Sequence, residues 1–208
     1  MSRFESSKFI RNGSVMRQDC LIAACDKLGW QYKIENDTIY VTDFGIGTTF
    51  GFEYAIKVEG TTVTYNTYYF DRTKEYVKKL QDVYNVLNVE YSKTVIIKAF
   101  KKNGFTFKSN PLFVQTDTEK ESFFMVGRSS IKNEDEPVGQ IKFTILYDGT
   151  IISDSDYLPE DVNKRAHASM DEIDDHFSSS RVMTRKEIPV KYRHKVKRDA
   201  NNHVVNIK

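Results

Sequence analysis

Apolar and polar residues alternate in several short stretches of the chain, which predicts β-strands. The clearest stretch covers residues 50–58, and a second run at 63–69 follows a Glu-Gly turn, so the two are predicted to form a hairpin. A shorter hairpin is predicted from 30–34 to 39–41, around Asn36-Asp37. Such alternation leaves each strand with one apolar and one polar face, which is typical of an antiparallel sheet with helices packed on one face.

Three other stretches repeat apolar residues at the helical period. The first covers 21–28, with Ser14 as a candidate cap and a glycine directly after it. The second runs from Asp71 to residue 102 and ends at an Asn-Gly pair, and the asparagines at 85–88 leave open whether it is one helix or two. The third starts at Pro159 and continues to residue 177.

Between the second and third helices, the pattern predicts strands at 105–107, 112–114 and 123–126, and a hairpin that begins at 141–145. The predicted fold class is α+β. We divide the chain into an α+β domain (1–128), a polar linker (129–139), a small hairpin–helix appendage (140–177) and a basic tail (178–208). Because the appendage is small, we expect it to dock on the first domain or on a partner chain.

The composition is ordinary for a globular protein, with 39% hydrophobic and 29% charged residues in a chain of 208. No apolar run reaches the roughly 18 residues that span a bilayer. Residues 1–13 lack the apolar segment of a secretory signal, so we expect a cytoplasmic protein without a membrane anchor. Cys20 and Cys25 lie in a helical pattern, which predicts core positions rather than a disulfide.

The charge is distributed unevenly along the chain. From Arg181 onward there are nine basic and two acidic residues, although the whole chain has a formal charge of only +2. An acidic body with a basic tail is typical of chains whose terminus meets a polyanion or an acidic protein surface, but a solvated, disordered tail is the favoured interpretation. The candidate binding residues are Arg185, Lys186, Lys191, Arg193, Lys195, Lys197 and Arg198.

One acidic cluster on the third helix could hold a metal ion. His167, Asp171 and Asp174 share a helical face and offer one nitrogen and two carboxylates to a divalent cation. The same residues would also form the solvated face opposite Met170 and Ile173, and this interpretation is favoured. We therefore predict no catalytic residue and no cofactor.

The aromatic content of 13% raises the question of a stacking platform for single-stranded nucleic acid. Phe50, Phe52 and Tyr54 are in phase with Ile56 and Val58, and this phase predicts that the rings belong to the core. The tail is therefore the stronger candidate for contact with nucleic acid.

Several short segments resemble a known family. Leu28-Gly29-Trp30, Gly51-Phe52, Phe70-Asp71 and the run Ala99-Phe100-Lys101-Lys102-Asn103-Gly104-Phe105 resemble the family of hypothetical chloroplast reading frame thirty-five, a domain of unknown function, over about residues 1–126. Residues 140–145 with Asp148-Gly149-Thr150 are similar to a second small uncharacterised family. The two resemblances together imply a fusion of two partners that are normally separate, without established catalytic residues. They also imply a protein partner, for which a motor ATPase is a candidate.

Three functional hypotheses follow. The first is a non-enzymatic accessory protein that binds other proteins, and the layout favours it. The second is a nucleic-acid-binding protein that uses the basic tail. The third is a metal-dependent hydrolase built on His167, Asp171 and Asp174, so enzymatic activity is left open but not favoured. The residue usage is typical of an AT-biased genome, with a viral source as one option.

Overall fold

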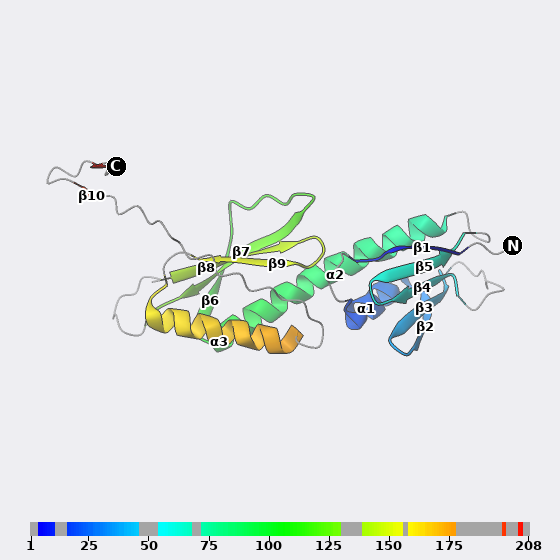
Figure 1. The fold of residues 1–208 in the computed structure, drawn as a ribbon, viewed down its shortest axis with the longest axis horizontal. Helices are drawn as coiled ribbons and strands as arrows, with labels where there is room; N and C mark the ends of the chain where they lie inside the picture. Colours follow the sequence, from blue (N-terminus) through cyan, green and yellow to red (C-terminus); the bar gives the residue numbers. More distant parts are fainter. Residues whose placement is uncertain are drawn as a thin grey trace.

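The computed structural model describes residues 4–10, 16–45, 54–67, 72–129, 139–155 and 158–177, and the short strands β10 (Lys197–Arg198) and β11 (Val204–Val205). Within these residues the chain forms the predicted α+β fold. Two antiparallel sheets lie toward opposite ends of one long helix, α2 (Thr73–Lys102), as Figure 1 shows. None of the described helices combines the length and the apolar character needed to cross a bilayer.

The N-terminal sheet has five strands in the order β1-β5-β4-β3-β2, and all neighbours are antiparallel. Its strands are β1 (Phe4–Lys8), β2 (Gln31–Glu35), β3 (Thr38–Asp43), β4 (Ile56–Glu59) and β5 (Thr62–Asn66). The two predicted hairpins are confirmed as β2–β3 and β4–β5, although the predicted strand ends at 50–53 and 68–69 lie outside the described residues. Asn36 and Asp37 have φ angles of 48° and 61°, the left-handed backbone that a two-residue hairpin turn requires.

Strand β1 was not predicted. It pairs with β5 from Phe4↔Asn66 to Lys8↔Thr62. As an edge strand with mostly exposed side chains, it needs no alternation of apolar residues, so the pattern gave no signal for it.

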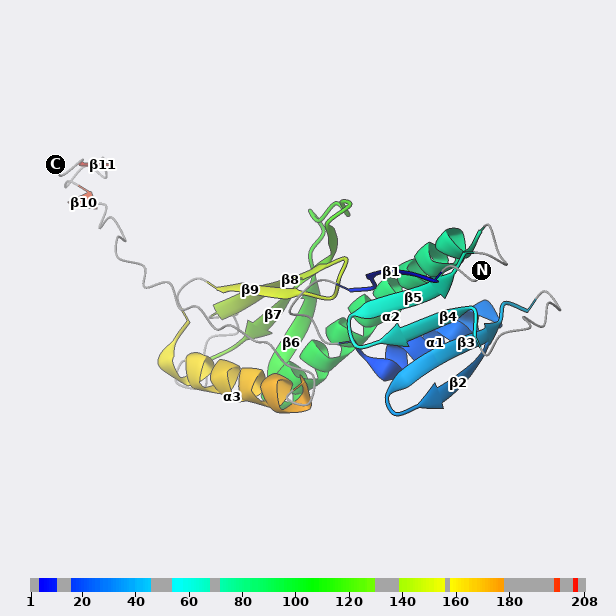
Figure 2. The ribbon, with the colours of Figure 1, turned by 45° about the vertical axis from the view of Figure 1, so that its right-hand side comes forward.

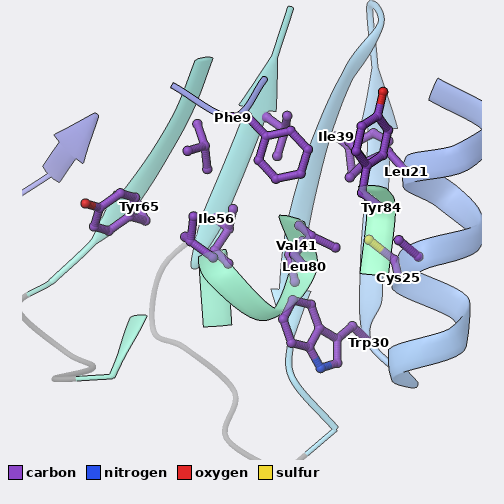
Figure 3. Packing of buried hydrophobic residues seen from close by; sticks show 14 of the residues in the cluster. Phe9, Leu21, Cys25, Trp30, Ile39, Val41, Ile56, Tyr65, Leu80 and Tyr84 are labelled. Carbon is purple, nitrogen blue, oxygen red and sulfur yellow. The ribbon is translucent and has the colours of Figure 1, made fainter. Parts of the chain in front are cut away.

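Helix α1 (Gln18–Leu28) covers one face of this sheet together with the first half of α2 (Figure 2). It ends at Gly29, whose φ of 68° makes the predicted left-handed stop. Arg17 occupies the N-cap position, and the predicted cap Ser14 lies outside the described residues. Cys20 and Cys25 are buried free thiols, as predicted. Figure 3 shows the core between the layers, which includes Phe9, Leu21, Cys25, Trp30, Ile39, Val41, Ile56, Leu80 and Tyr84.

Helix α2 is one continuous element of 30 residues, which settles the question left open at residues 85–88. Its first half contributes Leu80 and Tyr84 to the N-terminal core, and its second half contributes Ile96 and Phe100 to a second core. Asn88 is buried near the middle of the helix, and its Nδ2 donates a hydrogen bond to the Asp148 carbonyl oxygen at 3.3 Å. This bond satisfies a polar group that would otherwise be costly to bury.

The second sheet has four antiparallel strands in the order β6-β7-β8-β9. Its strands are β6 (Phe105–Ser109), β7 (Glu119–Gly127), β8 (Gly139–Leu146) and β9 (Ile151–Ser155), and the following helix is α3 (Glu160–Phe177). Strand β7 pairs with β8 from Gly127↔Gly139 to Glu119↔Leu146, across the predicted linker. The predicted appendage therefore completes the sheet that β6 and β7 begin, and α3 packs into the same core. The two cores divide within α2 rather than at residues 129–139.

Candidate functional site

The loop between β6 and β7, residues 110–118, carries the two most exposed of the large apolar side chains in the described part of the chain. Leu112 is 89% exposed and Val114 is 77% exposed. The prediction of a strand at 112–114 is wrong, because Asn110 and Pro111 form a turn there. The backbone N–H of Leu112 donates to Asn110 Oδ1 at 3.3 Å, and Pro111 has no N–H to give to a strand ladder.

Several hydrogen bonds fix the backbone on both sides of this loop. Asn110 Nδ2 donates to Ser122 Oγ at 3.1 Å. On the return side, the Tyr147 N–H donates to the Thr118 carbonyl oxygen at 2.8 Å, and Lys120 Nζ donates to the Thr116 carbonyl oxygen at 2.9 Å. The loop projects beyond the sheet and away from α3, as Figure 2 shows. Leu112 and Val114 are therefore exposed to solvent on a loop whose backbone is held in place by hydrogen bonds.

A second cluster lies where the three helices meet, and we call it the Arg17 joint. The guanidinium carbon of Arg17 is 3.7 Å from the centroid of the Tyr91 ring on α2 and 5.3 Å from that of the Phe177 ring on α3. Its Nη2 is 3.1 Å from Asp19 Oδ2, and its backbone N–H donates to Tyr84 Oη at 3.0 Å. One partly buried cation thus contacts α1, α2 and α3.

The ion pair with Asp19 favours the charged forms of both Arg17 and Asp19. Burial alone would lower the pKa of Arg17, but the hydrogen bond and charge of Asp19 outweigh it and raise the pKa above the ordinary value. Burial would raise the pKa of Asp19, but the hydrogen bond and charge of Arg17 lower it. Burial raises the pKa of Tyr84 to about 12. The ion pair therefore persists at neutral pH and acts as a structural contact.

The candidate metal ligands on α3 are not assembled into a binding site. His167 and Asp171 are exposed, and Asp174 is half-buried. His167 Nδ1 lies 2.9 Å from the carbonyl oxygen of Asn163, one turn earlier in the same helix. In the part of the chain that the structure describes, no three His, Cys, Asp or Glu side chains are grouped so that they could hold a metal ion.

The basic tail falls almost wholly outside the described residues. This applies to five of the candidate binding residues, Arg185, Lys186, Lys191, Arg193 and Lys195. Lys197 and Arg198 form β10, which pairs antiparallel with β11. Binding of nucleic acid by the tail stays a prediction.

The prediction that Tyr54 shares the core phase of β4 is wrong. Ala55 and Ile56 are both buried, so the alternation slips by one residue just before the strand begins. The Tyr54 ring instead lies 5.3 Å, between centroids, from that of Tyr40, whose neighbours in β3 point into the core. Phe50 and Phe52, predicted to share that phase, lie outside the described residues.

Sequence reasoning missed both the apolar loop and the Arg17 joint. For the loop a usable signal exists, because Asn110-Pro111 directly before an apolar run marks a turn. For the joint there is none, since Arg17, Tyr91 and Phe177 are far apart in the chain and meet only through the packing of three helices.

Comparison with known proteins gives no relative: no family model, no curated protein and no solved structure matches the chain.

Proposed function

We propose that this chain is a non-enzymatic accessory protein that binds another protein through Leu112 and Val114 on the β6–β7 loop. The observation that carries the proposal is the exposure of these two side chains, 89% and 77%, on a hydrogen-bonded loop. Exposed apolar groups on a fixed backbone lose little conformational entropy when they enter a partner's pocket, and their burial stabilises the complex.

The charges near the loop favour a protein pocket over an anionic membrane surface. Lys108 and Lys120 are balanced by Asp117 and Glu119, so the loop carries no excess of positive charge. Binding to anionic lipid needs such an excess beside the apolar residues. A partner pocket of apolar character with a mixed polar rim suits this surface better.

The proposal is tested by recovering partners from cells of the organism that encodes the chain. Tagged full-length protein is compared with the double variant Leu112→Ser/Val114→Ser and with the control Ile152→Ser, which replaces a 48% exposed isoleucine on β9. We expect at least one protein to be recovered with the wild type and the control but lost with the double variant. Recovery of the same proteins with all three would overturn the proposal.

A further inference from the structure

The polar face of the N-terminal sheet is a second surface, independent of the β6–β7 loop. The strand registers place one row of residues across all five strands: Lys33, Tyr40, Lys57, Thr64 and Ser6. Residues that alternate with this row in β3, β4 and β5 are buried in the core under α1 and α2. The row therefore points away from both helices, and we call this side the open face.

Three aromatic rings gather on the open face. The Tyr54 ring lies 5.3 Å from Tyr40 and 5.7 Å from Phe4, measured between centroids. The rings of the two pairs are inclined by 61° and 43°, so they do not cover one another face to face. Phe4 is 44% exposed although burial is the common state of such a ring.

Cations flank the central ring. The register pairs Lys33 with Tyr40 on one side and Lys57 with Tyr40 on the other, at the short distance of cross-strand neighbours. Lys57 Nζ lies 5.9 Å from the Tyr40 centroid and 2.6 Å from Glu59 Oε2. Among the described residues, no carboxylate lies within ion-pair distance of Lys33.

From this juxtaposition we propose that the open face binds single-stranded nucleic acid, with an unpaired base stacked on Tyr40 and the adjoining phosphates on Lys33 and Lys57. Aromatic platforms flanked by basic side chains are the common chemistry of such sites. An anionic ligand gains more from the lysines on either side of the ring than a neutral ligand does. Paired bases in a duplex could not offer their faces to Tyr40, Tyr54 and Phe4.

The affinity of the full-length protein for fluorescent oligothymidylate and oligouridylate of about 15 nucleotides is measured by anisotropy. A duplex of equal length is the third probe. We expect both single strands to bind more tightly than the duplex, and their ratio reports a preference for DNA or RNA. Replacing Tyr40 by Ala should weaken single-strand binding by roughly five- to a hundredfold, and replacing it by Phe should restore most of the affinity.

Lys33→Gln should flatten the plot of log K against log salt by about 0.7, the change expected for one lost phosphate contact with a single strand. Tyr147→Ala, which removes a 45% exposed tyrosine from the other half of the molecule, should leave binding unchanged.

Phe4→Ala at the sheet edge gives a second ring variant in case Tyr40→Ala does not fold. The proposal fails if neither oligonucleotide binds saturably, if the duplex binds as tightly, or if folded Tyr40→Ala or Phe4→Ala binds like the wild type. The last result would show that binding uses a surface other than the open face.

Discussion

At the scale of single residues, Arg17 connects parts of the chain that share no sequence neighbourhood. Its guanidinium lies over Tyr91 and beside Asp19, and its side chain is only 13% exposed. A cation held over an aromatic ring and shielded from water contributes more than an exposed ion pair. The joint therefore stabilises the packing of α1 and α3 on α2.

Arg17→Ala should lower the free energy of unfolding by about 1–3 kcal/mol, because it removes the cation–π contact and leaves Asp19 without its ion pair. Urea unfolding followed by circular dichroism measures the change. Lys27→Ala, which removes an exposed cation from the last turn of α1, should change it by less than about 0.5 kcal/mol. Equal effects of the two substitutions would show that Arg17 does not stabilise the packing of the helices.

Because the Cys25 thiol is buried, the free energy of unfolding should depend on pH in the alkaline range. Burial, with a smaller contribution from Asp26, raises the pKa of this thiol from 9.0 to about 12. The stability it contributes is complete below pH 9 and is lost as the pH rises toward 12, because only the unfolded thiol ionises in that range. Above pH 9 the free energy of unfolding should therefore fall more steeply in the wild type than in Cys25→Ala, by up to about 1.4 kcal/mol per pH unit. Chemical denaturation at a series of pH values gives both slopes. The slopes should coincide between pH 6 and 8, and coincidence above pH 9 as well would contradict a buried thiol.

At the scale of elements, the β8–β9 turn and α2 are fitted closely to each other. Gly149 has a φ of 82°, and a Cβ at this position would lie 2.1 Å from Asn88 Nδ2. Asn88 in turn donates its hydrogen bond to the carbonyl oxygen of Asp148. The turn can approach the middle of the helix because residue 149 has no side chain.

Gly149→Ala should therefore destabilise the fold more than Gly60→Ala does. Gly60 also has a positive φ, 55°, but a Cβ there meets nothing within 4 Å. Backbone strain costs about 1–2 kcal/mol in both variants, and the clash with Asn88 should add at least about 1 kcal/mol to the first. Thermal and urea unfolding provide the comparison. If the two glycine variants lose equal stability, the turn does not pack on Asn88 as described.

The elements show which local signals were sufficient and which were not. The hairpin at Asn36-Asp37 and the helix stop at Gly29 could be predicted because turn and cap residues act through their own backbone angles. Strand β1 could not, since it is held only by its pairing with β5. At Tyr54, a one-residue slip moved the ring from the predicted core to the open face, and no local pattern reports such a slip.

At the scale of the whole molecule, the single helix α2 contributes side chains to two separate hydrophobic cores. Tyr84 belongs to the first core and Val89 to the second, so the division falls in the middle of a continuous helix. The pairing of β7 with β8 across residues 130–138 is a long-range contact that the sequence pattern does not encode. As a result, most strands could be located from sequence, β1 being one exception, but their grouping into sheets could not.

The arrangement also sets the two proposed surfaces on different halves of the molecule. The β6–β7 loop belongs to the second sheet, and the open face belongs to the first. The two sheets lie toward opposite ends of α2 (Figure 1) and have separate cores. A variant in one surface should therefore leave the other intact, and each proposal can be tested alone.

The most direct test of the accessory role is photo-crosslinking in cells of the source organism. A photoreactive amino acid is placed at position 112 in one protein and at the exposed position 152 in another. We expect a discrete covalent adduct from position 112, with the same protein that Leu112→Ser/Val114→Ser fails to recover, and no such adduct from position 152. No adduct from position 112, or the same adducts from both positions, would contradict this role.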